Sequence, residues 1–236
     1  MELPFVKEMF ESIAPRYDFL NRLLSLRQDV QWRKKMVASL NIPPMGRVLD
    51  VACGTGDVAF EIFRQKGSSV TVCGVDFSVN MLSLAAAKAA GGRTAAGKAH
   101  YLAGDAFDLP FREGGFDALT IAFGIRNIMD KETVLAAFYR QLKPGGQLLV
   151  LELATPEHPL LTRLYLLYFQ RLLPLVGGLF SRNRHAYTYL PESVLRFPRA
   201  RDFAAMMRRT GFDRVRWRSL TFGIANLYVG VKGRRV

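Results

Sequence analysis

A short, mainly aliphatic run with an acid near its end, followed by a glycine turn, constrains the fold of this chain more than any other feature. The run is Val48-Leu49-Asp50-Val51, and the turn Cys53-Gly54-Thr55-Gly56-Asp57 leads into a helical pattern over Val58–Gln65. Two glycines one residue apart let the backbone turn sharply and approach a ligand without an intervening Cβ. The N–H groups that open the following helix add positive potential. This order predicts a binding site for a nucleotide-like cofactor.

The alternation of strand and helix continues along the chain. The expected strands are Arg47–Val51, Val70–Val75, Ala99–Ala103, Ala118–Phe123 and Gln147–Leu153, with helices at Val58–Gln65, Val79–Ala90 and Lys131–Leu142. The run Gln141–Gly146 predicts a helix stop before the last of these strands. Near the C-terminus, a helix over Phe203–Gly211 precedes the strands Val215–Leu220 and Ala225–Val231, which are joined at Gly223. This pattern predicts an α/β fold with a mainly parallel sheet and a terminal hairpin.

Length and composition favour a single domain. With 236 residues, 50% of them hydrophobic, the chain can bury a full core. We expect residues 1–45 to form an N-terminal helical lid and residues 46–153 to form the cofactor-binding core. We expect residues 154–202 to form a substrate- or membrane-facing insertion, with an amphipathic helix packed over the sheet as the alternative. We expect residues 203–236 to form a closing helix and hairpin. From periodicity alone, the first segment fits helices that merely pack on the core equally well.

The positive charge is concentrated in the C-terminal third. The net charge is +13, and residues 151–236 hold 15 Lys/Arg against 5 Asp/Glu. This imbalance indicates an anionic partner near that region, such as membrane headgroups, nucleic acid or a phosphorylated substrate.

Cysteine content and the N-terminus indicate a reduced, cytoplasmic protein. Cys53 and Cys73 are the only cysteines, and they do not form a disulfide framework. The N-terminus lacks the pattern of a signal peptide, and no uncharged apolar run is long enough to span a membrane. His100, His158 and His185 are scattered, so no metal site is expected.

The glycine turn fits two kinds of cofactor. Gly54, Gly56 and Ala59 match the loose dinucleotide pattern G-x-G-x-x-G/A, and Asp76 stands where a ribose-binding acid belongs. However, Asp50 and Asp57 bracket the turn. Placing carboxylates beside a pyrophosphate costs roughly 1 kcal/mol per contact even in water.

S-adenosylmethionine suits these acids better, because it carries an ammonium and a sulfonium and no phosphate. A further acid follows the next strand in Gly104-Asp105-Ala106, where it can bind the amino edge of adenine. Three acids at successive strand ends, Asp50, Asp76 and Asp105, therefore favour a cationic adenosyl ligand. We expect the cofactor to be bound by Asp50, Gly54, Thr55, Gly56, Asp76, Asp105 and Ala106.

The order of these segments, together with Leu142-Lys143-Pro144-Gly145-Gly146, resembles the motif series of class I S-adenosylmethionine-dependent methyltransferases. This resemblance implies a Rossmann-like sheet of seven strands, mainly parallel with an antiparallel last strand and helices on both faces. Nucleic-acid methyltransferases that modify exocyclic amines usually carry an Asn/Asp-Pro-Pro-aromatic motif after the fourth strand. Here that position is Ala122-Phe123-Gly124-Ile125, so a nucleic-acid substrate is a distant alternative.

Three flanking segments are more specific. Signatures of the menaquinone/ubiquinone C-methyltransferase family resemble three parts of the chain: Phe10–Asn21 followed by Leu24-Ser25 and Trp32-Arg33, then Thr120–Ile128, and finally Tyr187–Pro198. The resemblance implies methylation of a prenylated quinol at a ring carbon. The segment Leu26-Arg27-Gln28-Asp29 is closer to menaquinone-pathway relatives, which favours demethylmenaquinol as the substrate. The alternative is that the enzyme catalyses the C-methylation step of ubiquinone biosynthesis, or both steps. Ala122 departs from the family, since some members carry a serine there.

C-methylation requires an electron-rich ring carbon, so the enzyme must stabilise a developing phenolate beside it. We expect Arg126 to do so, since it follows a strand whose carboxyl end faces the cofactor. Asn127, Tyr17 and Asn21 are candidate hydrogen-bonding partners in the pocket, with local capping roles as the alternative. A prenyl tail would keep the substrate in the bilayer, which predicts transient contact with the anionic inner face of the membrane. The arginines expected to make this contact are Arg163, Arg171, Arg182, Arg184 and Arg196.

Overall fold

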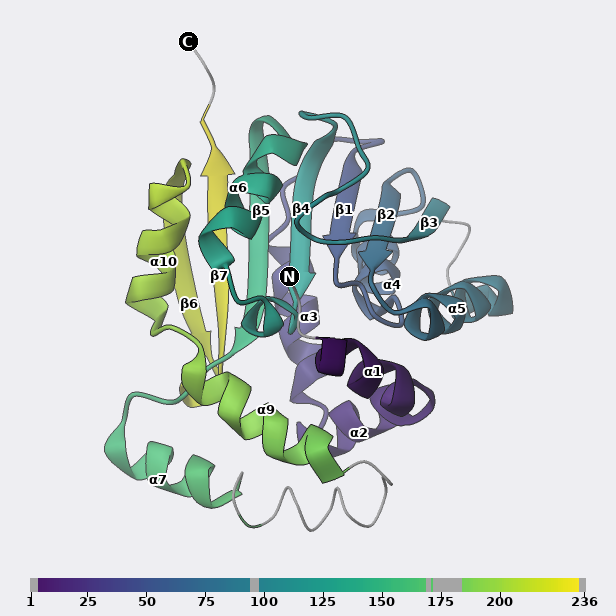
Figure 1. Cartoon of the computed structure of the whole chain (residues 1–236). Coiled ribbons are helices and arrows are strands. Elements are labelled where there is room, and N and C mark those ends of the chain that lie inside the picture. The colour runs from purple at the N-terminus through teal and green to yellow at the C-terminus, as the bar shows by residue number, and fades with distance from the viewer. Residues whose placement is uncertain (1–3, 94–97, 169–170, 172–183, 234–236) are drawn as a thin grey trace.

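In the part of the chain that the structure describes, seven strands form one sheet in the order β3-β2-β1-β4-β5-β7-β6 (Figure 1). The structure is a computed structural model that describes residues 4–93, 98–168, 171 and 184–233. The strands are β1 (Arg47–Val51), β2 (Thr71–Asp76), β3 (Lys98–Ala103), β4 (Phe116–Ala122), β5 (Leu142–Leu153), β6 (Phe212–Leu220) and β7 (Ala225–Lys232). The first five run parallel, and β7 pairs antiparallel with both β5 and β6. The predicted parallel sheet with an antiparallel last strand is confirmed.

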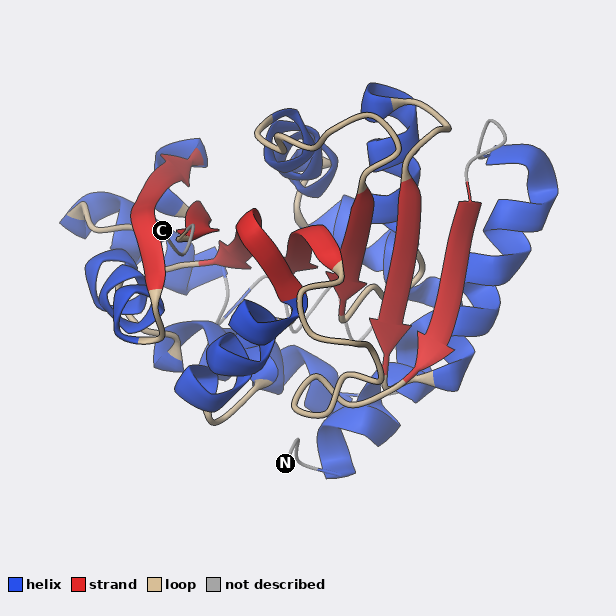
Figure 2. Ribbon diagram, turned by 90° about the horizontal axis from the view of Figure 1, so that it is seen from above, coloured by secondary structure: helices blue, strands red, loops and turns tan. Residues whose placement is uncertain are grey.

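Helices cover both faces of this sheet, as the view from above shows (Figure 2). The helices are α1 (Pro4–Ile13), α2 (Tyr17–Leu24), α3 (Gln28–Ala38), α4 (Asp57–Lys66), α5 (Val79–Lys88), α6 (Lys131–Gln141), α7 (Pro159–Leu167), α9 (Arg184–Arg196) and α10 (Ala200–Arg209). Short helical turns are η1 (Ala14–Arg16), η3 (Ile125–Asn127) and η5 (Thr221–Gly223).

The strands present alternate residues to two hydrophobic layers. Leu49 and Val150 face α6 and α10, where they pack with Phe138 and Phe203. Their neighbours on the same strands, such as Val48, face α3 and α4 on the other side. Because side chains alternate along a strand, a sheet buried on both faces reads as a continuous apolar run. This explains why the expected strands were recognisable from the sequence.

The start of β5 differs from the prediction. The sequence predicted a helix to Leu142 and a strand that begins only at Gln147. In the structure α6 ends at Gln141, and β5 starts at once with Leu142, which pairs with Phe116 of β4. A shift in register before Ala118 pairs with Gln147 absorbs the extra residues. The glycines and proline expected to form a break are therefore part of an irregular strand.

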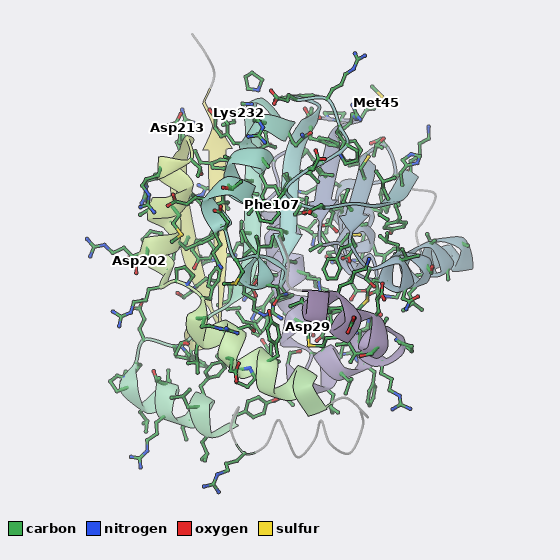
Figure 3. All side chains as sticks on the ribbon, viewed as in Figure 1. Asp29, Met45, Phe107, Asp202, Asp213 and Lys232 are labelled. Carbon is green, nitrogen blue, oxygen red and sulfur yellow. The ribbon has the colours of Figure 1, made fainter. Side chains whose placement is uncertain are left out.

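The N-terminal helices lie at the carboxyl end of the parallel strands, together with α9 (Figure 1). The sequence pattern predicts a helix break at Pro15, and the structure confirms it, since η1 separates α1 from α2. Figure 3 shows Asp29 of α3 near this end, and Asp213 and Lys232 at the opposite end of the molecule. Pro174, Gly177 and Gly178, where the sequence predicts that a helix ends or kinks, lie outside the described residues. Cys53 and Cys73 are buried free thiols.

Candidate active site

The glycine turn joins β1 to α4 and leaves space on one side. Gly54 has a φ of +53° and Gly56 a φ of +82°, which L side chains rarely adopt. A Cβ at Gly56 would lie 2.6 Å from the Tyr101 hydroxyl oxygen, whereas a Cβ at Gly54 would meet no atom within 4 Å. Gly56 is therefore required for packing, and Gly54 borders a space in which a ligand can approach the backbone.

Asp50 is almost completely buried beside this turn. Its Oδ1 accepts a hydrogen bond from the Thr120 hydroxyl at 2.7 Å, while Oδ2 is buried and has no partner among the described residues. Burial raises the pKa of Asp50 to about 7, although the bond from Thr120 opposes the shift. A buried carboxylate oxygen that lacks a donor is unfavourable by itself and is suited to a cationic ligand group.

The other two predicted acids follow the neighbouring strands. Asp76 accepts hydrogen bonds from the backbone N–H groups of Gly54 at 2.8 Å and Ser78 at 2.9 Å, and burial raises its pKa against these bonds. Asp105 is exposed in the turn after β3, where its Oδ1 accepts from the N–H of Phe107 at 2.9 Å; Ala106 beside it is buried. Since β1, β2 and β3 are adjacent and parallel, all three acids lie at one edge of the sheet.

Asp57 behaves differently from the sequence-based expectation that it would attract a cationic ligand. Its carboxylate lies 3.0 Å from Lys88 Nζ, 3.6 Å from Arg22 Nη2 and 3.7 Å from Arg33 Nη1. Burial opposes ionisation, but these cations hold the pKa of Asp57 below its usual value. Its charge is thus already compensated within the protein.

Thr55 connects the glycine turn to the N-terminal helices. Its hydroxyl donates to Asp18 of α2 at 2.6 Å and accepts from Lys88 of α5 at 2.8 Å. Lys88 also forms an ion pair with Asp18. In addition, the ring of Phe10 in α1 packs edge-on against Phe77, which directly follows Asp76. Side chains from α1, α2 and α5 therefore hold the N-terminal helices over the edge of the sheet that carries the acids.

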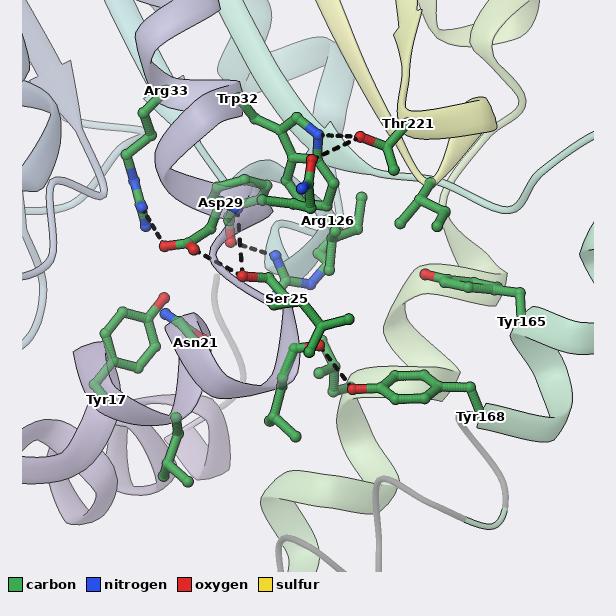
Figure 4. A pocket seen from close by; sticks show the side chains of 18 of the residues that line it. Tyr17, Asn21, Ser25, Asp29, Trp32, Arg33, Arg126, Tyr165, Tyr168 and Thr221 are labelled. Atoms are coloured by element: carbon green, nitrogen blue, oxygen red, sulfur yellow. Dashed lines mark hydrogen bonds and ion pairs between the residues drawn. The ribbon is translucent and has the colours of Figure 1, made fainter.

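A cavity of about 430 Å³ lies beneath these helices. It is lined mainly by apolar side chains from α1, α2, α3, α7, α9 and the loop between β6 and β7 (Figure 4). Its lining residues are Met9, Phe10, Ile13, Tyr17, Leu20, Asn21, Leu24, Ser25, Leu26, Gln28, Asp29, Trp32, Arg33, Phe123, Arg126, Leu153, Pro156, Leu161, Leu164, Tyr165, Tyr168, Tyr189, Leu190, Thr221, Phe222 and Ile224. At its mouth Leu26 is 82% exposed and Phe222 is 80% exposed.

The polar side chains of this cavity gather around Tyr17. The hydroxyl of Tyr17 lies beside Asn21 (Figure 4) and in the field of Arg126, Arg33 and Asp76. Burial raises the pKa of Tyr17, while the arginines and Asn21 oppose the shift. Because Asp76 belongs to the acidic edge of the sheet, this polar end of the cavity lies beside the expected cofactor site.

Arg126 is held in the cavity wall by a buried ion pair. Its Nη1 donates to Glu152 Oε1 at 2.8 Å and to the carbonyl of Phe123, and its backbone N–H donates to Glu152 Oε2 at 3.0 Å. Burial opposes the charge of the guanidinium, but Glu152 and Tyr17 raise the pKa of Arg126. Its Nε is buried without a partner among the described residues. An unpaired donor in the wall of a cavity is suited to a ligand oxygen.

Asn127 is placed differently from the other three predicted catalytic residues. Tyr17, Asn21 and Arg126 line the cavity, whereas Asn127 does not. Asn127 is buried in η3, and its Oδ1 accepts a hydrogen bond from the hydroxyl of Tyr189 at 3.1 Å. Since Tyr189 does line the cavity, the structure gives Asn127 a supporting position behind it.

Comparison with known proteins identifies the family. The model of the ubiE/COQ5 methyltransferase family matches residues 2–232. The chain belongs to the ubiE/COQ5 methyltransferase family. It is 47% identical to the ubiquinone/menaquinone biosynthesis C-methyltransferase of Geotalea daltonii over 96% of each chain. It is 49% identical to the demethylmenaquinone methyltransferase of Deinococcus radiodurans, over 96% of this chain and 92% of the relative.

A solved structure supports the fold of this ubiE/COQ5 family member. The chain is similar to an S-adenosylmethionine-dependent methyltransferase of Thermotoga maritima with a TM-score of 0.66 and 20% identity, over 96% of this chain and 99% of that one. The class I methyltransferase fold expected from the sequence is confirmed. Within the described residues, the structure contains no helix of the length and hydrophobicity needed to cross a membrane.

The methyl donor of this family is S-adenosylmethionine, and the residues at the sheet edge fit it. The buried, unpaired Oδ2 of Asp50 is suited to the ammonium of the cofactor. The open space at Gly54 allows close approach to the backbone. The carboxylate of Asp76 accepts backbone N–H groups and still has acceptor capacity left for ribose hydroxyls.

Sequence reasoning missed Asp29, Arg33 and Glu152. Asp29 and Arg33 are buried together in the cavity wall, with 2.6 Å between their charged atoms. Glu152 is fully buried beneath Arg126. The only signal for Glu152 was a charged residue inside an otherwise apolar strand. Asp29 and Arg33 stood in segments that matter for family resemblance, but nothing in their local pattern pointed toward a cavity.

Proposed function

We propose that this protein transfers a methyl group from S-adenosylmethionine to a ring carbon of a prenylated quinol, with demethylmenaquinol as the substrate. The cavity carries this proposal, because its polar end adjoins the acidic sheet edge and the rest of its wall is apolar. A quinol ring with hydroxyl groups matches the polar end, and a prenyl tail matches the apolar remainder. The volume of about 430 Å³ falls in the range of small-molecule sites.

The cofactor supplies an electrophilic methyl group on its sulfonium, and the protein must direct an electron-rich ring carbon toward it. The unpaired Nε of Arg126 is the donor we assign to the quinol oxygen beside the reacting carbon. A guanidinium is too weak an acid and base to exchange protons here, so its role is to stabilise negative charge on that oxygen. Tyr17 and Asn21, which lie together at the polar end of the cavity, orient the ring.

The role of Arg126 can be tested in a variant that preserves the shape of the wall. Changing Arg126 to alanine or glutamine alone leaves Glu152 buried without a partner, so we pair Arg126→Gln with Glu152→Gln. We expect kcat to fall about 100- to 1000-fold, as for loss of one oxyanion donor, with little change in the affinity for S-adenosylhomocysteine. Wild-type turnover in this folded double variant would rule out the assignment.

The substrate is best decided by mass spectrometry of the product. The protein is incubated with S-adenosylmethionine and demethylmenaquinol, and separately with the demethylated ubiquinol precursor. We expect a mass gain of one methyl group on demethylmenaquinol. Methylation of the benzenoid precursor alone would replace this substrate by the ubiquinone-pathway one, and methylation of neither would reject the proposal.

We also propose that the N-terminal helices act as a lid and that the cavity mouth meets the membrane. Thr55, Asp18 and Lys88 tie α2 to the glycine turn, so release of this contact opens the cofactor edge. The exposed side chains of Leu26 and Phe222 at the mouth support contact with lipid. The protein would then work in the cytoplasm, at the inner face of the membrane.

Exposed basic residues in the C-terminal third support contact with an anionic lipid surface. Arg163, Arg171 and Arg196 are exposed. The side chain of Arg184 and the whole of Arg182 lie outside the described residues. Each arginine near such a surface contributes about 1 kcal/mol. Flotation with anionic and neutral vesicles at low salt tests this contact: we expect recovery with anionic vesicles, reduced by Leu26→Ser together with Phe222→Ser. Equal recovery with both lipids would exclude it.

A further inference from the structure

Arg33 of α3 is a buried cation that the proposed reaction does not use. Only 8% of its surface is exposed, and it lies in the wall of the cavity. Its Nη1 donates to Asp29 Oδ2 at 2.6 Å and lies 3.7 Å from Asp57 Oδ2, while its guanidinium stands 5.3 Å from the centre of the Phe123 ring. Burial opposes its charge, but Asp57 and Asp29 raise the pKa of Arg33, so it stays protonated.

The guanidinium is only partly used by the protein. Among the residues that the structure describes, Nε and Nη2 have no hydrogen-bond acceptor. Figure 4 shows Arg33 beside Asp29 at the end of the cavity that also holds Tyr17. A buried guanidinium with unused donors in a cavity wall is a site for an anion, and its planar fork matches a carboxylate.

The position of Arg33 relative to the glycine turn indicates which anion. Arg33 lies close to Asp57 at one end of the turn. Its field also reaches Asp50 at the other end, where it opposes the rise in pKa that burial causes. Asp50 has the unpaired oxygen suited to the cofactor ammonium. In the methionine part of the cofactor, ammonium and carboxylate are attached to the same carbon atom. A cation that receives the carboxylate must therefore lie within a few ångströms of the group that receives the ammonium.

We propose that Arg33 binds the carboxylate of the methionine part of S-adenosylmethionine. Two other cations near the turn are less suitable. Lys88 already contacts Asp18, Asp57 and Thr55, which account for its three donors. Arg22 does not line the cavity, and its side chain is 38% exposed. The assignment concerns the methyl donor and does not depend on which quinol ring is methylated.

Ligands that differ only at the amino-acid end test this assignment by calorimetry, without any methyl acceptor. We compare S-adenosylhomocysteine with its decarboxylated analogue and with 5′-methylthioadenosine, which lacks the amino-acid end. The wild type is expected to bind S-adenosylhomocysteine roughly 10- to 100-fold more tightly than the decarboxylated analogue, the range for a charged hydrogen-bonded pair. Arg33→Gln should abolish this preference and leave the affinity for 5′-methylthioadenosine unchanged.

Two further variants separate binding from folding. Arg33→Gln leaves Asp29 buried without its cation, so Asp29→Asn with Arg33→Gln provides a neutral pair of similar shape and carries the same expectation. Arg22→Gln removes another arginine that faces Asp57 and should retain the wild-type preference. A wild type that binds both ligands equally overturns the proposal. So does a folded variant at Arg33 that keeps the preference, or one that weakens all three ligands by the same factor.

Discussion

Replacing Asp50 by asparagine should make the ligand-free protein more stable at alkaline pH and weaken cofactor binding. Asp50 is buried, its Oδ1 is bound to the Thr120 hydroxyl, and its Oδ2 lacks a partner in the described structure. Asparagine has nearly the same shape and can still accept the bond from Thr120. The substitution therefore removes the buried charge and changes little else.

The magnitude follows from the raised pKa. Burial moves the pKa of Asp50 from 3.8 to about 7, so the stability that its neutral form contributes is fully present below pH 3.8 and is lost as pH rises through 7. About three pKa units correspond to about 4 kcal/mol at pH 8. The new amide N–H₂ group lacks an acceptor, which costs about 1–3 kcal/mol. We expect Asp50→Asn to gain about 1–3 kcal/mol at pH 8.

Urea unfolding of the ligand-free protein at pH 8 and pH 5 measures this effect. At pH 5 the wild-type carboxyl is mostly protonated in the folded state, so the advantage of the variant should fall by about 2–3 kcal/mol. In calorimetry the variant should bind S-adenosylhomocysteine at least tenfold more weakly, because the ligand ammonium loses its charged partner. A free-energy difference between variant and wild type that is the same at both pH values would refute the reasoning.

Three further substitutions test other parts of the site. Gly54→Ala places a Cβ in open space at a φ of +53°. We expect it to lower the free energy of unfolding in urea by about 1 kcal/mol and to weaken S-adenosylhomocysteine binding more than tenfold. Unchanged affinity would show that no ligand approaches the backbone there. Lys88→Met removes the donor shared by Asp18, Asp57 and Thr55. We expect faster amide hydrogen exchange in α2 and unchanged exchange in α6. The same exchange rate in α2 of the variant and the wild type would argue against a stabilising role of this contact. Glu152→Gln leaves Arg126 without its counter-charge and should lower the free energy of unfolding by about 3–5 kcal/mol. Adding Arg126→Gln should restore most of the lost stability. If it does not, the unpaired charge of Arg126 is not the reason for the loss.

The sheet was predictable because its signals are local. Mainly apolar runs such as Val48–Val51, bounded by glycine or polar residues, identified the strands to within a few residues, and Gly54 and Gly56 marked the turn. The main error concerned residues 142–146, which the local pattern places in a break. Pairing of Leu142 with Phe116 on β4 extends β5 through them, and this pairing is a contact between distant parts of the chain.

The candidate site was predictable only in part. Asp50, Asp76 and Asp105 could be placed together because the carboxyl ends of parallel strands meet at one edge. Asn127 was expected in the pocket with Arg126, but in the structure it lies behind the wall against Tyr189. One residue along a tight helical turn changes the direction of a side chain, and a sequence does not show which of two neighbours faces the cavity.

The sequence by itself determined the parallel sheet, the glycine turn and the family to which the chain belongs, because hydrophobic periodicity, backbone dihedrals and motif order are carried by short stretches of residues. Only the tertiary structure decided which of the carboxylates beside the glycine turn are free to bind a cationic ligand. In the sequence Asp57 resembles an open acid, yet Lys88, Arg22 and Arg33 neutralise it from three different helices. Asp50 stands in an equally acidic sequence context but keeps an unpaired oxygen. Ion pairing depends on distances of a few ångströms between side chains that folding brings together from distant positions.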